Sequence, residues 1–152
     1  MNKIPTIFTP KIYIASSEEG FDLKTKIIEY LVNKTVVDVG PHTKYTVDSV
    51  IYACMVAELV LEDERHCGIL ISETANDMVI MANRFKGIRA VIVTDDISVQ
   101  HSKKILNSNI FCMSLNTEIE LIEKWFNIKN IYNEKNMRTI YLMDSLHPIG
   151  CI

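Results

Sequence analysis

Short, almost wholly apolar segments alternate along this chain with longer segments of helical periodicity, and this alternation constrains the fold most strongly. The apolar segments cover residues 11–15, 35–39, 68–71, 89–93 and 109–113. Apolar side chains recur at helical spacing in residues 20–33, 47–61, 74–85, 95–106, 117–127 and 131–144. Strands separated by helices predict parallel βαβ units, and continuous apolar strands predict a sheet that is covered on both faces. We therefore expect an α/β fold, a three-layer α/β/α sandwich with about five parallel strands.

The length of 152 residues is that of one ordinary domain. We expect a single domain over residues 1–152, with its core in residues 11–126. The C-terminal helix and tail, residues 127–152, are expected to pack on a partner subunit, because the helix has few bulky apolar repeats and the tail is apolar.

Composition excludes several functional classes. A formal net charge of −3 gives no overall electrostatic reason to bind nucleic acid. No apolar stretch approaches the ~18–20 residues that a membrane span requires. The four cysteines show no C-x-x-C spacing, and the absence of such spacing is typical of reduced thiols. We therefore expect a cytoplasmic protein that binds neither nucleic acid nor membrane.

The expected fold also indicates where a ligand would bind. In open parallel sheets, ligands bind beyond the carboxyl ends of the strands. Three loops follow the first three expected strands at that edge, and they cover residues 16–20, 40–48 and 72–77. Candidate site residues are therefore sought in these loops.

Four segments near these loops carry a resemblance to one family. They are EGFDLKTKIIEYL (19–31), VVDVGPH (36–42), GILI (68–71) and MANRFKGIRAVIVTDD (81–96). The string from Ala82 to Ala90 is the most specific of these motifs. In this order the segments resemble the type B ribose-5-phosphate isomerases and the related galactose-6-phosphate isomerase subunits, over roughly residues 11–126. The resemblance implies a Rossmann-like fold, a dimer, and active sites shared between two subunits.

The resemblance also implies a chemistry, the interconversion of an aldose phosphate and a ketose phosphate through an enediolate, without a cofactor. This reaction needs a base next to the carbonyl and donors that hold the developing negative oxygen. The family supplies the base from a Cys that opens the loop after strand three, or in one branch from a Glu six positions later. A Gly-rich loop holds the oxyanion, an Asp-His pair and a partner His-Asn pair open the sugar ring, and arginines of the partner's C-terminal helix bind the phosphate.

This sequence departs from the family at most of those positions. The Asp-His pair corresponds to Ser17 and Glu18, and the Cys position is Ser72. The branch's Glu position is Met78, and the His-Asn pair corresponds to Ile105 and Leu106. Ser72 would be a weak base without an activating neighbour. The ring-opening pair and both known sources of the base are therefore replaced.

The oxyanion loop and the phosphate-binding helix depart as well. The loop reads SETAND over residues 72–77, so that all three glycines of the family loop are replaced. Of the basic cluster only Arg138 matches, and the earlier arginine position is Glu134. The positions expected to line a substrate site are Ser17, Glu18, Asp48, Thr74, Asn76 and Arg138. We therefore expect a catalytically impaired homologue or a non-catalytic subunit.

Three residues or pairs could replace the lost groups. Glu73 or Asp77 could act as the base, although both are also explained as solvated acids near the start of the helix over 74–85. His101 lies one helical turn before Ile105 and could replace the missing His, or it is an ordinary surface histidine. Glu18 could act where the family has His, but it would be an anion that faces an anionic substrate. The catalytic candidates are thus Ser72, Glu73, Asp77 and His101.

Three functions remain open at this point. The first is a non-catalytic subunit, either a homodimer or a mixed oligomer with a paralogous subunit. The second is an active phosphosugar isomerase with a rearranged site, and the third is a binding module for another ligand, in view of the acidic residues near the loops. Two His-Cys pairs, His66 with Cys67 and His147 with Cys151, lack a matched second half, so that no metal site is expected.

Overall fold

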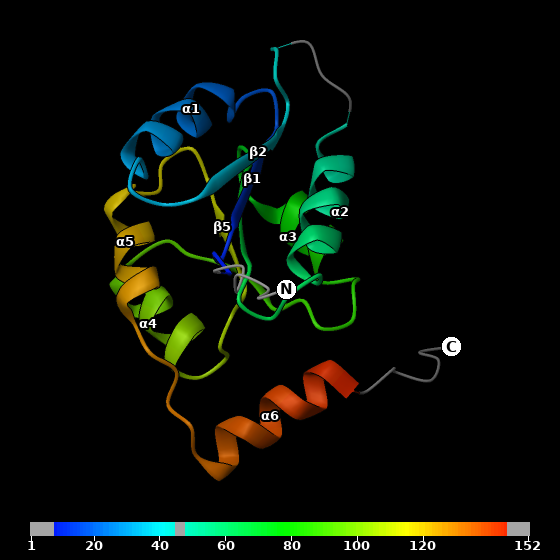
Figure 1. The fold of residues 1–152 in the computed structure, drawn as a ribbon, viewed down its shortest axis with the longest axis vertical. Coiled ribbons are helices and arrows are strands. Elements are labelled where there is room, and N and C mark those ends of the chain that lie inside the picture. Colours follow the sequence, from blue (N-terminus) through cyan, green and yellow to red (C-terminus); the bar gives the residue numbers. More distant parts are fainter. Residues whose placement is uncertain (1–7, 45–47, 146–152) are drawn as a thin grey trace, which may run out of the picture.

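The computed structural model describes residues 8–44 and 48–145, and its centre is a sheet of five parallel strands (Figure 1). The strands lie in the order β2-β1-β3-β5-β4. Their bounds are Ile12–Ser16 for β1, Val36–Gly40 for β2, Cys67–Ile71 for β3, Ala90–Ile92 for β4 and Ile110–Met113 for β5. The last strand in the sequence therefore lies between the third and the fourth.

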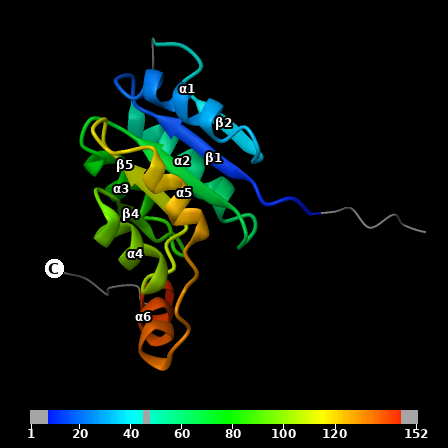
Figure 2. The same cartoon turned by 90° about the vertical axis from the view of Figure 1, so that its left-hand side faces the viewer.

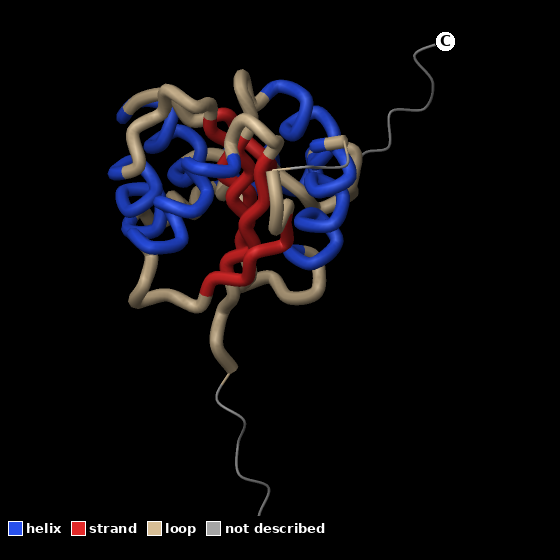
Figure 3. The backbone as a smooth tube through the Cα atoms, turned by 90° about the horizontal axis from the view of Figure 1, so that it is seen from above, coloured by secondary structure: helices blue, strands red, loops and turns tan. Residues whose placement is uncertain are grey.

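Helices cover both faces of this sheet, as Figure 3 shows. Their bounds are Phe21–Tyr30 for α1, Ser49–Val60 for α2, Asn76–Ala82 for α3, Asp96–Lys104 for α4, Glu120–Asn127 for α5 and Glu134–Ser145 for α6. The buried side chains of α2 and α3 pack on one face, and those of α1, α4 and α5 pack on the other. The prediction of a three-layer, Rossmann-like α/β/α fold is confirmed.

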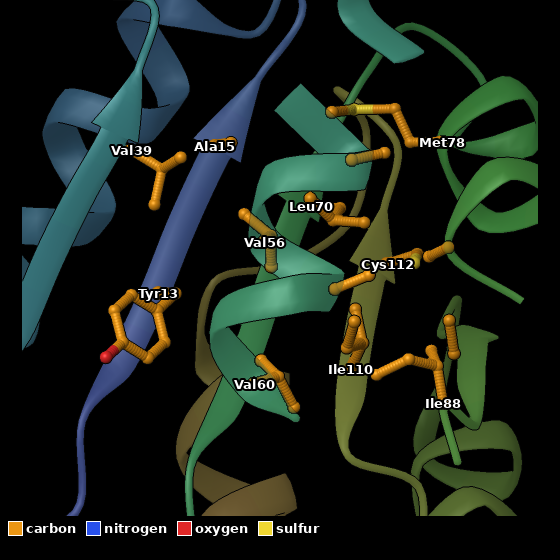
Figure 4. Packing of buried hydrophobic residues seen from close by; sticks show 14 of the residues in the cluster. Tyr13, Ala15, Val39, Val56, Val60, Leu70, Met78, Ile88, Ile110 and Cys112 are labelled. Atoms are coloured by element: carbon orange, nitrogen blue, oxygen red, sulfur yellow. The ribbon is translucent and has the colours of Figure 1, made fainter. Parts of the chain in front are cut away.

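Strand side chains alternate between the two hydrophobic cores because successive residues of a strand point to opposite faces. Tyr13, Leu70 and Cys112 contribute to the core beneath α2 and α3 (Figure 4). Ile14 and Phe111 contribute to the core beneath α1, α4 and α5. Every residue of β1 is buried, as the continuous apolar strands predicted.

The predicted strand ends agree with the structure within one residue and the helix ends within three. One expected start is wrong in a way that concerns the site. The helix after β3 was expected to begin at Thr74, but it begins at Asn76. The preceding residue, Ala75, is left-handed with a φ of 66°, which turns the chain so that Thr74 lies outside the helix. The Oγ1 atom of Thr74 accepts a bond from the amide of Asn76 at 3.4 Å instead.

The last helix, α6, lies at one end of the body and beyond the sheet (Figure 2). An ion pair attaches it, in which Arg89 Nη1 donates to both carboxylate oxygens of Asp144 at 2.9 and 2.8 Å. Apolar side chains of α6 are exposed, including Met137, Tyr141 and Met143. This exposure agrees with the expectation that the segment packs on a partner, which stays a prediction. Residues 146–152 of the expected tail lie outside the described residues.

Candidate functional site

The loops after β1 and β3 begin side by side at the carboxyl edge of the sheet. The amide of Ser17 donates to the carbonyl of Ile71 at 2.8 Å, and the amide of Ser72 donates to the carbonyl of Met113 at 3.3 Å. Both serines are buried, with 6% and 3% of their surface exposed. The parallel register of the strands thus brings together two of the three loops in which ligand binding was expected.

Asp77 is the centre of a hydrogen-bond network in the loop after β3. Ser72 Oγ donates to Asp77 Oδ1 at 2.7 Å, and Ser49 Oγ donates to Asp77 Oδ2 at 2.6 Å. The backbone amides of Asp77 and Met78, in the first turn of α3, also favour the charged form of this carboxyl group. Both carboxylate oxygens therefore accept hydrogen bonds from within the chain.

These contacts determine the charge of Asp77. Burial raises the pKa of its carboxyl group, but the hydrogen bonds from Ser49 and Ser72, together with the two amides, outweigh burial, so that the pKa lies below its usual value. Asp77 is therefore ionised at neutral pH. Burial, and then the charge of Asp77, raise the pKa of the Cys112 thiol on β5.

Two backbone donors of the same loop, the amides of Ala75 and Asn76, also have partners within the loop. Ser72 Oγ accepts a bond from the amide of Ala75 at 3.0 Å. Ala75 is completely buried and left-handed, a conformation that costs a non-glycine residue roughly 1–2 kcal/mol. The loop therefore keeps a tight turn without glycine, and these two amides point at oxygens of its own side chains.

The loop after β1 brings further negative charge to this edge. The side chain of Ser17 donates to the carboxylate of Glu19 and so lowers the pKa of that group, while the charge of Asp77 acts in the opposite direction. Glu18 and Glu73 are exposed. Asp48 is the N-cap of α2, where its Oδ1 accepts a bond from the amide of Val50 at 3.4 Å.

Two of the expected site residues lie elsewhere within the single chain. His101 is exposed on α4, and Arg138 lies on α6 beside a shallow pocket that Asn133 and Thr139 also line. Both helices lie in the lower half of Figure 1, whereas the loops after β1 and β3 lie at the opposite edge of the sheet. Neither residue meets Ser72 or Asp77 inside one chain.

Sequence analysis missed two polar residues near this edge. Ser49 carries no functional signal in the sequence, because a serine at the start of a helix is common, yet its hydroxyl is one of the two that donate to Asp77. Lys24 has only 1% of its surface exposed, and its Nζ donates to Asp38 Oδ1 at 2.7 Å and to the carbonyl of Pro41. Its spacing from Ile27, Ile28 and Leu31 is that of the buried face of α1, which is a signal that could have identified it.

A glycine shapes the next loop of this edge. Gly40, the last residue of β2, has a φ of +132°, and a Cβ at this position would lie 2.5 Å from the Tyr52 ring. Only glycine therefore combines this backbone turn with the close approach of α2. Residues 45–47 of the same loop, which include Tyr45, lie outside the described residues.

Comparison with known proteins identifies the family. A sequence model described as Ribose/Galactose Isomerase matches residues 12–140. The chain belongs to the ribose/galactose isomerase family.

Within the described part of the chain, no group of His, Cys, Asp and Glu could hold a metal ion, and no helix is long and apolar enough to cross a membrane.

Individual members of the family resemble the chain over most of its length. A putative sugar phosphate isomerase of Rickettsia typhi is 38% identical over 107 residues, which are 69% of this chain and 74% of the relative. A galactose-6-phosphate isomerase subunit of Clostridium acetobutylicum is 34% identical over 116 residues, 74% of this chain and 65% of the relative. The crystal structure of a ribose 5-phosphate isomerase from Thermotoga maritima superposes with a TM-score of 0.83 at 29% identity, and the match covers 90% of this chain and 99% of that one.

Proposed function

We propose that this chain is a catalytically impaired member of the ribose/galactose isomerase family that acts as a non-catalytic subunit. The observation that carries the proposal is the Asp77 carboxylate, which accepts hydrogen bonds from the Ser49 and Ser72 hydroxyls where the loop after β3 joins α3. In the family resemblance, this loop is the place where the substrate's oxyanion is held. Here a negative charge of the protein itself occupies the loop.

Electrostatics opposes the isomerase reaction at such a loop. An enediolate oxygen about 4 Å from an ionised carboxylate is repelled by about 4 kcal/mol at an effective dielectric constant near 20. That energy corresponds to roughly 10³-fold in rate. The Glu19 carboxylate, which interacts with Asp77 electrostatically, adds repulsion of the same sign.

The loop also lacks an evident base. The hydroxyl of Ser72 donates to Asp77, and the lowered pKa of Asp77 makes its carboxylate a weak proton acceptor. Loss of a general base typically costs ~10²–10⁴ in rate. Base, oxyanion donors and ring-opening pair are thus all altered in one site.

We propose a homodimer or a mixed oligomer with a paralogous subunit. The apolar side chains Met137, Tyr141 and Met143 on α6 have no cover within the described chain, and α2 exposes Ile51 and Met55. The similar Clostridium protein is named a subunit. In an assembly, Arg138 of one chain would serve the loop of another, since it lies far from its own.

The proposal extends to the chain as a whole. Residues 1–152 would act as one domain in the cytoplasm, with no cofactor. Cys54, Cys67 and Cys112 are free thiols in the structure, which is typical of proteins in a reducing compartment.

The alternative is an active phosphosugar isomerase with a rearranged site, in which Asp77, Glu73 or His101 replaces the base. One observation favours Asp77 among these, because its carboxylate accepts a hydrogen bond from Ser72, the residue at the family's Cys position. A binding module for a cationic ligand is a further alternative, since Glu19 and Asp77 place two carboxylates at one edge.

Turnover assays test these functions. The purified chain is incubated with ribose 5-phosphate, allose 6-phosphate and galactose 6-phosphate, and the ketose phosphates are followed over hours. We expect no product above an empty-vector control, whereas product that disappears in Asp77→Asn but persists in Glu58→Gln would establish the rearranged enzyme.

Co-purification of a paralogue with the family's Cys and His would support the subunit function, and a homodimer that exchanges with no paralogue would exclude the mixed oligomer.

A further inference from the structure

A second pocket lies at the opposite edge of the sheet, where β1, β2 and β3 begin. It has a volume of about 330 Å³, which is within the usual range of small-molecule sites. The residues just before β1 and β2 and the first residue of β3 line it, together with Phe126 of α5 and Arg65. This pocket shares no residue with the loops at the carboxyl edge.

Among the described residues, the charges that line this pocket are positive. Lys11, Lys34 and Arg65 line it, and no Asp or Glu of the described part of the chain does. Arg65 is already paired with Asp63, which accepts two guanidinium hydrogen bonds at 2.9 and 2.8 Å. Within the described chain, the ammonium groups of Lys11 and Lys34 have no carboxylate within 4 Å, so that two cations face the pocket uncompensated.

Charged groups of both signs lie near this pocket. Lys103 of α4 lies over the Trp125 ring, with its Nζ 4.0 Å from the ring centroid, and it interacts electrostatically with Cys67 in the pocket wall. Burial lowers the pKa of Lys103, and the charge of Arg89 adds to the effect. The one carboxylate in the adjoining hollow, Glu123, accepts a hydrogen bond from the Tyr30 hydroxyl at 2.7 Å.

The rest of the pocket is apolar. Pro10, Ile12 and Phe126 contribute carbon surface, and Lys34 Nζ lies 4.7 Å from the centroid of the Phe126 ring. A bare anion would leave this carbon surface in contact with water. A ligand with an anionic group and a ring would cover the apolar wall while its charge meets the two lysines.

We propose that this pocket binds a small phosphate monoester that carries an aromatic ring, as a nucleoside monophosphate does. The phosphate lies between Lys11 and Lys34, and the ring lies against Ile12 and Phe126. The site is separate from the isomerase-like loops. The proposal therefore holds whether or not those loops turn over a sugar phosphate.

Calorimetric titration of the full chain with AMP tests this site, with adenosine and inorganic phosphate as partial probes. We expect AMP to bind at least tenfold more tightly than either partial probe, because each probe satisfies only half of the pocket. Equal affinity for inorganic phosphate and AMP would overturn the role of the ring, and absence of AMP binding would overturn the site.

Matched variants locate the binding. Lys34→Gln and Lys11→Gln are each expected to weaken AMP binding about tenfold or more, since a charge-assisted hydrogen bond is lost. Lys86→Gln, an exposed lysine on the loop after α3, removes the same charge elsewhere and should leave the affinity unchanged. Equal weakening in all three variants would show a general charge effect and refute the pocket. Amide resonances of Thr35 and Cys67 should shift on AMP addition in the wild type.

Discussion

The ion pair between Lys24 and Asp38 joins α1 to the middle of β2, and its two partners differ in burial. Lys24 has 1% of its side chain exposed, whereas Asp38 has 33% exposed. The change Asp38→Asn preserves the shape and the acceptor for the Gly40 amide, but it leaves a buried ammonium without its counter-charge. The change Lys24→Met removes the buried charge and leaves a carboxylate that water reaches.

The two substitutions should therefore lower the free energy of unfolding by different amounts. Removing one partner of a buried pair typically costs ~3–5 kcal/mol, while replacing the buried ion by an apolar side chain of similar volume is often close to neutral. The carbonyl of Pro41 still accepts from Lys24, which reduces the expected cost of Asp38→Asn to about 2–3 kcal/mol. We expect Lys24→Met to cost less than about 1 kcal/mol.

Urea and thermal unfolding measure this difference. For a chain of this length, a change of 1 kcal/mol in the free energy of unfolding shifts the melting temperature by about 2–4 °C. The Asp38→Asn variant should therefore melt several degrees below the Lys24→Met variant. Asp96→Asn is the matched control, because the Lys124–Asp96 pair has a distance of 2.6 Å but is more than half exposed on both sides. A Lys24→Met variant as unstable as Asp38→Asn, or an equal loss in Asp96→Asn, would refute the reasoning.

Three further predictions concern the core, the loop after β3 and α6. Gly68→Ala places a Cβ 2.7 Å from Val56 Cγ1 and should lower the free energy of unfolding by about 1–3 kcal/mol in urea. Because folding lowers the pKa of Asp77 from its ordinary 3.8, the stability that this carboxylate contributes is present above about pH 4 and is lost as the pH falls further. The wild type should therefore exceed Asp77→Asn in melting temperature at pH 7, and this advantage should shrink at pH 3. Asp144→Asn removes the charged partner of Arg89, and hydrogen exchange should accelerate across residues 134–145 while the sheet stays protected.

The sequence predicted the strands well because the apolar segments are short, continuous and bounded by turn residues. Residues 36–40 and 110–113 form strands where runs of apolar residues indicated them. The sequence did not predict the order of the strands, because the position of β5 between β3 and β4 depends on packing between distant segments. Local patterns carry no information about such pairing.

The candidate site was only partly predictable for a related physical reason. The resemblance located the loop over 72–77, but the left-handed Ala75 and the displaced start of α3 follow from a turn that the residue types disfavour. Ser49 reaches Asp77 from a different helix, 28 residues away in sequence. Such a contact becomes visible only when α2 and α3 are packed side by side.

The place of β5 has a consequence for synthesis on the ribosome. Among the described strands, β4 pairs only with β5, and β3 has β5 as its second neighbour. Until residues 110–113 have left the exit tunnel, β4 has no partner and one side of β3 presents unpaired amide and carbonyl groups. A nascent chain that stalls when its last residue outside the tunnel lies between 93 and 109 would therefore expose a sheet edge that can join another chain, and chaperone capture should peak while that segment emerges.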